Sequence, residues 1–197
     1  MDLILLEPGD QSIMGEGKAW TVDAGESLID TTWRDNSTMK DMKRCVEMVS
    51  IHQGLKQQMT TDVSNSARTS GRPIVSEFTC VKYADKISVM LYDRCLRAKP
   101  LDTRDSGPTK LYVCRNSGDQ TSVIMTISLR FAMISEIQFQ SHPNDMPTEQ
   151  FKLNFAEILW EHTVQRVDSS IGGNISSGWS LARNRPLDGK FSDGFAS

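Results

Sequence analysis

The sequence predicts an all-β barrel or sandwich with a single α-helix packed on it. Three observations lead to this prediction. A long segment at 121–141 alternates apolar and polar residues, several shorter runs repeat that pattern, and one stretch has helical periodicity instead. Alternation with a period of two is typical of strands that have one face in a core. Because strands and helices do not alternate along the chain, a parallel sheet is not expected.

The segment 121–141 is too long to be one straight strand. Its apolar residues occupy the odd positions Val123, Met125, Ile127, Leu129, Phe131, Met133, Ile137 and Phe139. A straight strand through these positions would run to about 50 Å at about 3.3 Å per residue, and a core of this size cannot cover it. We therefore expect the strand to bend, with Ala132 and Ser135 as the places for the bend.

The N-terminal part is expected to contain one strand and a long irregular connection. Residues 3–6 are a short apolar run typical of a strand. Residues 9–44 contain four glycines, scattered charges and two tryptophans. Ser37 is a candidate N-cap for a short helix through Arg44. Because 9–44 is too long for a plain loop in a compact domain, we interpret it as an inserted subdomain or an arm that packs outside the domain.

The next segments indicate two further strand regions separated by a loop. Residues 45–59 predict a strand region whose inward side carries Val49, Ile51, Leu55 and Met59. Residues 60–73 have almost no large apolar side chain, which indicates an exposed, flexible loop. Residues 74–83 are a β-rich run.

The periodicity then changes to that of a helix. Asp85 is a suitable N-cap, and Ile87, Leu91 and Cys95 follow at spacings of four residues. The helix is expected to end before Pro100, which cannot continue it.

The chain after the helix is expected to be strands and turns. Residues 111–115 predict a short strand, and the turn at 116–119 joins it to the long strand as a hairpin. Apolar residues occupy odd positions in 151–155 and even positions in 158–164. A β-bulge at Ala156 and Glu157 would explain this change of parity.

The chain is predicted to be a single domain. A glycine-rich turn is expected at 171–174 and a last strand at 177–183. The domain would span 1–186, with the long inserted connection at 9–44, and a flexible tail would follow at 187–197.

Composition excludes several classes of partner. The 197 residues carry a net charge of −3 without a basic block, so a nucleic-acid footprint is not predicted. No apolar run approaches the roughly 18 residues of a membrane span, so membrane insertion is not predicted. The N-terminus has no basic segment before its four apolar residues, unlike a signal peptide. The protein is therefore expected to start in the cytoplasm, and a dedicated machine would be needed to export it.

No motif indicates catalysis, a metal or a cofactor. The cysteines are Cys45, Cys80, Cys95 and Cys114; they form no metal-binding spacing and are expected to be free, buried thiols. The three histidines show no metal or nucleophile signature. We therefore expect no enzyme and no cofactor. A binding or assembly protein is favoured, and the alternatives are a monomeric β-barrel that holds a small apolar ligand or a hydrolase with an unrecognised site.

The order of motifs from residue 76 onward resembles the Hcp family, the hemolysin-coregulated proteins of bacterial type VI secretion. The motifs are FTCVKYADKISVMLYDRCL, TSVIMTISLRFAMISEIQF, FKLNFAEILWEHTVQ and GWSLARN, and the resemblance covers about 45–184. It implies a small β-barrel of two antiparallel sheets with one flanking α-helix, similar to a phage tail tube protein. It also implies homo-hexameric rings that stack into a tube inside a contractile sheath, carry effector proteins, meet a tip spike protein and leave the cytoplasm by type VI secretion without a signal peptide.

The resemblance also suggests positions for contacts. In the family, the loop after the second strand helps one ring meet the next, which corresponds here to 60–73. The candidate ring-stacking residues are Thr61, Asp62, Ser66, Arg68 and Arg72. The polar side of the long strand would face the ring's lumen, with Thr126, Ser128 and Arg130 as candidates. The connection at 9–44 is longer than is usual in the family.

Overall fold

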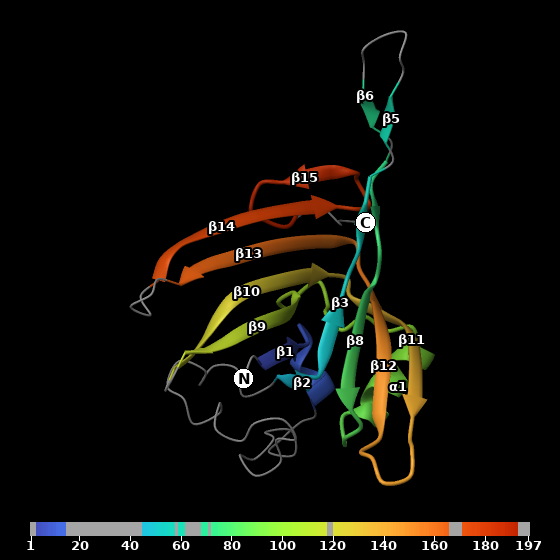
Figure 1. Ribbon diagram of the computed structural model, residues 1–197. Helices are drawn as coiled ribbons and strands as arrows, with labels where there is room; N and C mark the ends of the chain where they lie inside the picture. Colours follow the sequence, from blue (N-terminus) through green and yellow to red (C-terminus); the bar gives the residue numbers. More distant parts are fainter. Residues whose placement is uncertain are drawn as a thin grey trace.

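The computed structural model describes residues 3–14, 45–57, 59–61, 68–70, 72–117, 120–165 and 171–192. Two antiparallel sheets form the body, and a helix lies against one of them (Figure 1). The mainly β prediction with one α-helix is confirmed for the described residues. The strands of the body form two separate sheets rather than one continuous closed ladder.

The larger sheet has seven strands. In spatial order they are β15 (Arg185–Leu187), β14 (Ile171–Ser180), β13 (Glu157–Gln165), β10 (Gln120–Arg130), β9 (Thr109–Ser117), β1 (Leu3–Glu7) and β2 (Val46–Met48). β9 and β10 pair antiparallel as the predicted hairpin, with Ser117 opposite Gln120. The turn residues 118–119 lie outside the described residues.

The smaller sheet has four strands. In spatial order they are β11 (Met133–Gln140), β12 (Thr148–Asn154), β8 (Phe78–Tyr83) and β3 (Ser50–His52). The helices are η1 (Gln11–Met14) and α1 (Ser88–Leu96). Two short hairpin ladders complete the described structure: β4 (Leu55–Lys56) with β7 (Ile74–Val75), and β5 (Met59–Thr61) with β6 (Arg68–Ser70).

The long segment 121–141 bends where it passes from one sheet to the other. β10 ends at Arg130, Phe131 adopts a positive φ of 53°, and β11 begins at Met133 in the four-stranded sheet. The predicted bend at Ala132 is confirmed. At Ser135, the second predicted place, the register with β12 shifts between Ile134 and Glu136.

The apolar odd positions of this segment do not share one face, contrary to the prediction. Val123 and Met125 lie opposite the consecutive residues Cys114 and Val113, so one extra residue bulges from β10. Val123 therefore packs with a small cluster on one face of the sheet, whereas Ile127 belongs to the main core on the other face. An inserted residue reverses the parity of every residue beyond it.

The predicted bulge at Ala156 and Glu157 is wrong. β12 ends at Asn154 in the four-stranded sheet, and β13 begins at Glu157 in the seven-stranded sheet. The change of parity marks a corner at which the chain passes between sheets. β2 and β3 are joined by a similar corner at Val49, whose backbone N–H donates to Val81 O at 2.7 Å.

Two predictions for shorter segments are also corrected. In 45–59 the predicted inward residues Val49, Leu55 and Met59 are 43%, 63% and 62% exposed, while Val46 and Met48 of β2 are buried. The predicted glycine-rich turn at 171–174 lies within β14, and the predicted last strand ends at Ser180.

Parts of the connection and tail predictions lie outside the described residues. These include 15–44, with the short helix proposed from Ser37, and 193–197. The described start of the tail packs against the body. Leu187 belongs to β15 and is buried, and the backbone N–H of Ser192 donates to Glu157 at 3.0 Å.

The main core lies between the two sheets and α1. Its buried members come from both sheets and from the helix: Leu6, Ile13, Val46, Met48, Phe78, Cys80, Ile87, Leu91, Leu101, Leu111, Ile127, Leu129, Ala132, Ile134, Phe151, Leu153, Phe155 and Ile158. All four cysteines are free, as predicted, but Cys95 is only partly buried. Burial raises the pKa of Cys80 and of Cys114 to about 12.

Candidate functional site

A two-part hairpin projects beyond both main sheets (Figure 1). We call residues 55–75 the arm. Its inner part is the β4–β7 ladder and its outer part is the β5–β6 ladder, in which Met59 lies opposite Ser70 and Thr61 opposite Arg68. Part of the predicted loop at 60–73 is therefore paired strand. Asp62 and Ser66, two of the candidate stacking residues, lie outside the described residues.

The two sides of the arm are joined at its base by a short side chain. Gly54 N–H donates to Ser76 Oγ at 2.7 Å, and both Ser76 N–H and Ser76 Oγ–H donate to Gly54 O at 2.9 Å. These bonds close the hairpin where it leaves β3 and β8. They hold its two strands together before the outer ladder begins.

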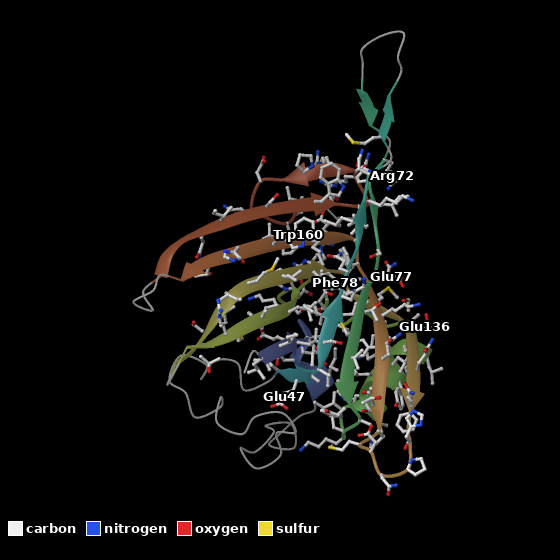
Figure 2. All side chains as sticks on the ribbon, in the orientation of Figure 1. Glu47, Arg72, Glu77, Phe78, Glu136 and Trp160 are labelled. Atoms are coloured by element: carbon white, nitrogen blue, oxygen red, sulfur yellow. The ribbon has the colours of Figure 1, made fainter. Side chains whose placement is uncertain are left out.

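Arg72, one of the candidate stacking residues, makes a hydrogen bond within its own chain. Its Nη2 donates to the backbone carbonyl of Leu181 at 2.7 Å. Leu181 directly follows β14, so the bond joins the arm to the turn that leads into β15, the edge strand of the seven-stranded sheet. Figure 2 shows Arg72 at the base of the arm, next to the ends of the C-terminal strands.

An apolar groove of about 330 Å³ runs beside the base of the arm. Its lining residues are Leu55, Lys56, Gln57, Pro73, Ile74, Val75, Trp160, Ser177, Gly178 and Trp179. Leu55 and Ile74 are 63% and 56% exposed, although both are large and apolar. Exposed apolar side chains beside an apolar groove are typical of protein–protein contact surfaces.

A second groove, of about 530 Å³, lies between α1 and β11. It is lined by Tyr92, Cys95, Leu96, Ile137 and Phe139. Leu96 is 87% exposed and Phe139 is 59% exposed. β11 is an edge strand of the four-stranded sheet, so among the described residues the backbone groups beside this groove pair with a strand on one side only.

A buried ionic cluster fixes α1 to the four-stranded sheet. Lys82 Nζ donates to Glu149 Oε1 at 2.8 Å, to Asp85 Oδ1 at 2.9 Å and to Ser88 Oγ at 3.2 Å. Lys82 and Glu149 are 0% and 1% exposed. A buried charge is tolerated only with such partners, so the cluster fixes the start of the helix over β8 and β12.

The prediction that Asp85 is the N-cap of the helix is wrong, because α1 begins at Ser88 and its N-cap residue is Ile87. Asp85 acts in the turn just before the helix, where its Oδ1 accepts the backbone N–H groups of Ile87 and Ser88. The far side of the cluster is completed by Tyr92, whose hydroxyl donates to Glu149 Oε2 at 2.7 Å. Burial and this carboxylate raise the pKa of Tyr92 to about 12.

The three lumen candidates lie on the face of the seven-stranded sheet that points away from the main core. Thr126 is partly exposed, but Ser128 is only 3% exposed and offers almost no surface in this chain. Arg130 Nη1 donates to Ser106 O at 2.8 Å, and its guanidinium lies 5.9 Å from the centre of the Phe191 ring. The segment before residue 193 therefore covers part of this face. The assignment of these residues to a lumen stays a prediction.

Neither a metal cluster nor a membrane-spanning helix was found in the described part of the chain. No group of three His, Cys, Asp or Glu side chains there is placed to hold a metal ion. No helix among these residues is long and apolar enough to cross a membrane.

Comparison with known proteins identifies a family and a fold. The family model described as "Type VI secretion system effector, Hcp" matches residues 34–162. No curated protein matches the chain. A solved structure described as "Structure of a type six secretion system protein" is 17% identical, with a TM-score of 0.70, and the match covers 95% of this chain and 100% of that one.

Two further solved structures have the same fold. Hcp1 from Salmonella typhimurium is 15% identical with a TM-score of 0.63, and the match covers 94% of this chain and 99% of that one. A type VI secretion system effector from Yersinia pestis is 16% identical with a TM-score of 0.58, covering 90% and 98%. These likenesses show the fold, and the family model, which matches more than half of the chain, shows membership. The chain belongs to the Hcp family of type VI secretion system proteins.

Proposed function

We propose that this chain is a tube subunit that assembles as a homo-hexameric ring and stacks with further rings. Membership in the Hcp family supports this role. The observation that carries the stacking step is the arm, a paired hairpin that extends beyond both main sheets (Figure 1). Such an element reaches a neighbouring ring without any rearrangement of the body, and the apolar side chains at its base add contact surface.

The sheet edges support ring closure. β11 and β3 are the edges of the four-stranded sheet, and β15 and β2 are the edges of the seven-stranded sheet. Edge strands expose backbone donors and acceptors that favour pairing with another chain. Neighbouring copies in a closed ring would cover these groups, and a ring leaves no unmatched end.

The remaining parts of the role concern transport. The chain would start in the cytoplasm and be secreted by the type VI apparatus without a signal peptide. Its partners would be further rings, the contractile sheath, a tip spike protein and effectors carried in the lumen. Thr126 and Arg130 are the lumen candidates with exposed surface. The role is structural rather than catalytic.

Native mass spectrometry tests ring formation. The expected dominant species has six times the 22.1 kDa mass of one chain. A single monomeric species at high protein concentration contradicts the proposal. Because edge pairing and apolar contacts both contribute, the hexamer is expected to persist at moderate salt.

A second candidate function is the binding of a small apolar ligand. The groove between α1 and β11 favours it, since its volume of about 530 Å³ lies in the range of small-molecule sites. This groove lies at the surface, whereas the interior is filled by side chains such as Phe78 and Phe151. A thermal-shift screen of lipids and apolar metabolites tests this function. A stabilising compound whose effect disappears in Phe139→Ser supports it, and a screen without stabilisation removes it.

A further inference from the structure

A line of hydrogen bonds connects the corners of the body to the base of the arm. Ala156 N–H donates to Arg130 O at 2.9 Å, and Leu181 N–H donates to Ala156 O at 2.9 Å. Arg72 Nη2 then donates to Leu181 O at 2.7 Å. We call these three bonds the corner belt. Its first two bonds join the ends of β10, β12 and β14, and its third joins them to the arm.

The third bond differs from the other two because it is made by a side chain. Leu181 lies one residue after the end of β14, where its carbonyl has no strand partner in the ladder with β15. The Arg72 guanidinium supplies the donor across a sequence separation of 109 residues. A planar, permanently charged guanidinium holds a carbonyl in a defined direction, and a charge-assisted bond is stronger than a neutral one.

The hydrogen bonds at the base of the arm have two different effects. The Ser76–Gly54 bonds join its two sides to each other, so they close the hairpin without fixing its direction. The Arg72–Leu181 bond reaches the other sheet, so it determines how the arm is directed relative to the body. Val75 of the inner ladder also packs against the main core, but apolar packing is non-directional, whereas the planar guanidinium of Arg72 holds its acceptor in one direction.

We infer that Arg72 is a positioning residue that sets the direction of the arm by holding the carbonyl of Leu181. This inference rests on the proposed stacking function for its consequence, because a misdirected arm meets the next ring poorly. The sequence analysis placed Arg72 among the candidate contact residues of the stacking loop, and the inference gives it a different role. For the other candidates, which are Thr61, Asp62, Ser66 and Arg68, the contact role stays a prediction.

The direction of the arm can be measured without stacking. We suggest spin labels on Thr69→Cys in the arm and Asn174→Cys in β14, in a Cys95→Ser background. Cys45, Cys80 and Cys114 would stay unlabelled because all three thiols are buried. Dilution with unlabelled protein limits the signal to one labelled chain per assembly. Pulsed electron spin resonance then gives the distribution of distances between arm and body.

The parent protein is expected to show one narrow distribution. Arg72→Ala should broaden it about twofold or shift its maximum, because the arm loses its anchor on the second sheet. Arg72→Lys, which keeps the charge but not the guanidinium, should give an intermediate width. Lys56→Ala is the matched control: it removes an exposed positive charge from β4 and should leave the distribution unchanged.

Stacking is scored separately, by imaging the same variants. A changed distance distribution in Arg72→Ala supports the inference whether or not stacking fails, and normal stacking of that variant would count against the proposed function alone. An Arg72→Ala distribution identical to that of the parent overturns the inference, even if stacking is lost. A response to Lys56→Ala as large as that to Arg72→Ala also overturns it, because charge rather than the anchor would then set the direction.

Discussion

The carboxylate of Asp102 accepts the backbone N–H of Ala132 at 2.7 Å, across 30 positions in the sequence. Its other oxygen accepts the N–H of Phe131 at 2.8 Å. Both donors lie at the corner where β10 passes into β11. Asp102 is 0% exposed, and burial raises its pKa, while the two N–H donors and Arg130 act in the opposite direction. One carboxylate thus satisfies the peptide groups that the corner removes from both sheets.

Asp102→Ala should destabilise the fold strongly. The substitution removes the acceptor of the buried N–H of Ala132 and of the partly buried N–H of Phe131, and a buried N–H that loses its acceptor costs about 1–3 kcal/mol. We expect the free energy of unfolding, measured by urea denaturation, to fall by about 3 kcal/mol. Asp105→Ala removes an exposed carboxylate from the same loop and serves as the control. A similar, small effect of both substitutions would show that the corner does not depend on Asp102.

Lys82→Met should release α1 from the sheet. It leaves the buried Glu149 carboxylate without its cation, and breaking one side of a buried ion pair costs about 3–5 kcal/mol. The double variant with Glu149→Gln should recover part of this loss. Lys152→Ala is the matched control, because its partner Glu136 is half-exposed and solvent screens that pair. A double variant less stable than the single one would contradict the assignment.

The free energy of unfolding should fall at alkaline pH because of Tyr92. Its pKa is raised from 10 to about 12 in the folded chain, so the folded state holds the phenolic proton more tightly than the unfolded state. The stabilising contribution of the protonated Tyr92 is fully present below pH 10 and is lost as the pH rises through about 12. Urea denaturation of the parent and of Tyr92→Phe over this range measures it. Equal pH slopes in the two proteins would contradict the raised pKa.

The sequence predicted most strands, the helix and the bend at Ala132, because these follow from local periodicity. It did not distinguish a corner from a bulge at Ala156, since each reverses the parity of the apolar positions. The difference depends on distant partners, namely Arg130 O and Leu181 N–H, which local patterns do not specify.

The arm shows the same limit for the candidate site. Its polar composition indicated exposure, but the pairing of β5 with β6 depends on register, and Thr and Ser favour turns as well as strands. No local signal indicated that Arg72 reaches Leu181. Leu55 was predicted on the inward side of its strand but is 63% exposed, because alternation alone does not tell which side of a strand is covered.

The most direct test of the stacking role is electron microscopy of negatively stained protein lacking residues 61–70. The parent protein is expected to show rings and stacks of rings at high concentration, and the shortened protein should show rings of the same diameter that do not stack. The deletion removes the outer ladder but keeps Arg72 and the Ser76–Gly54 bonds at the base. Stacks as long as those of the parent would contradict the account.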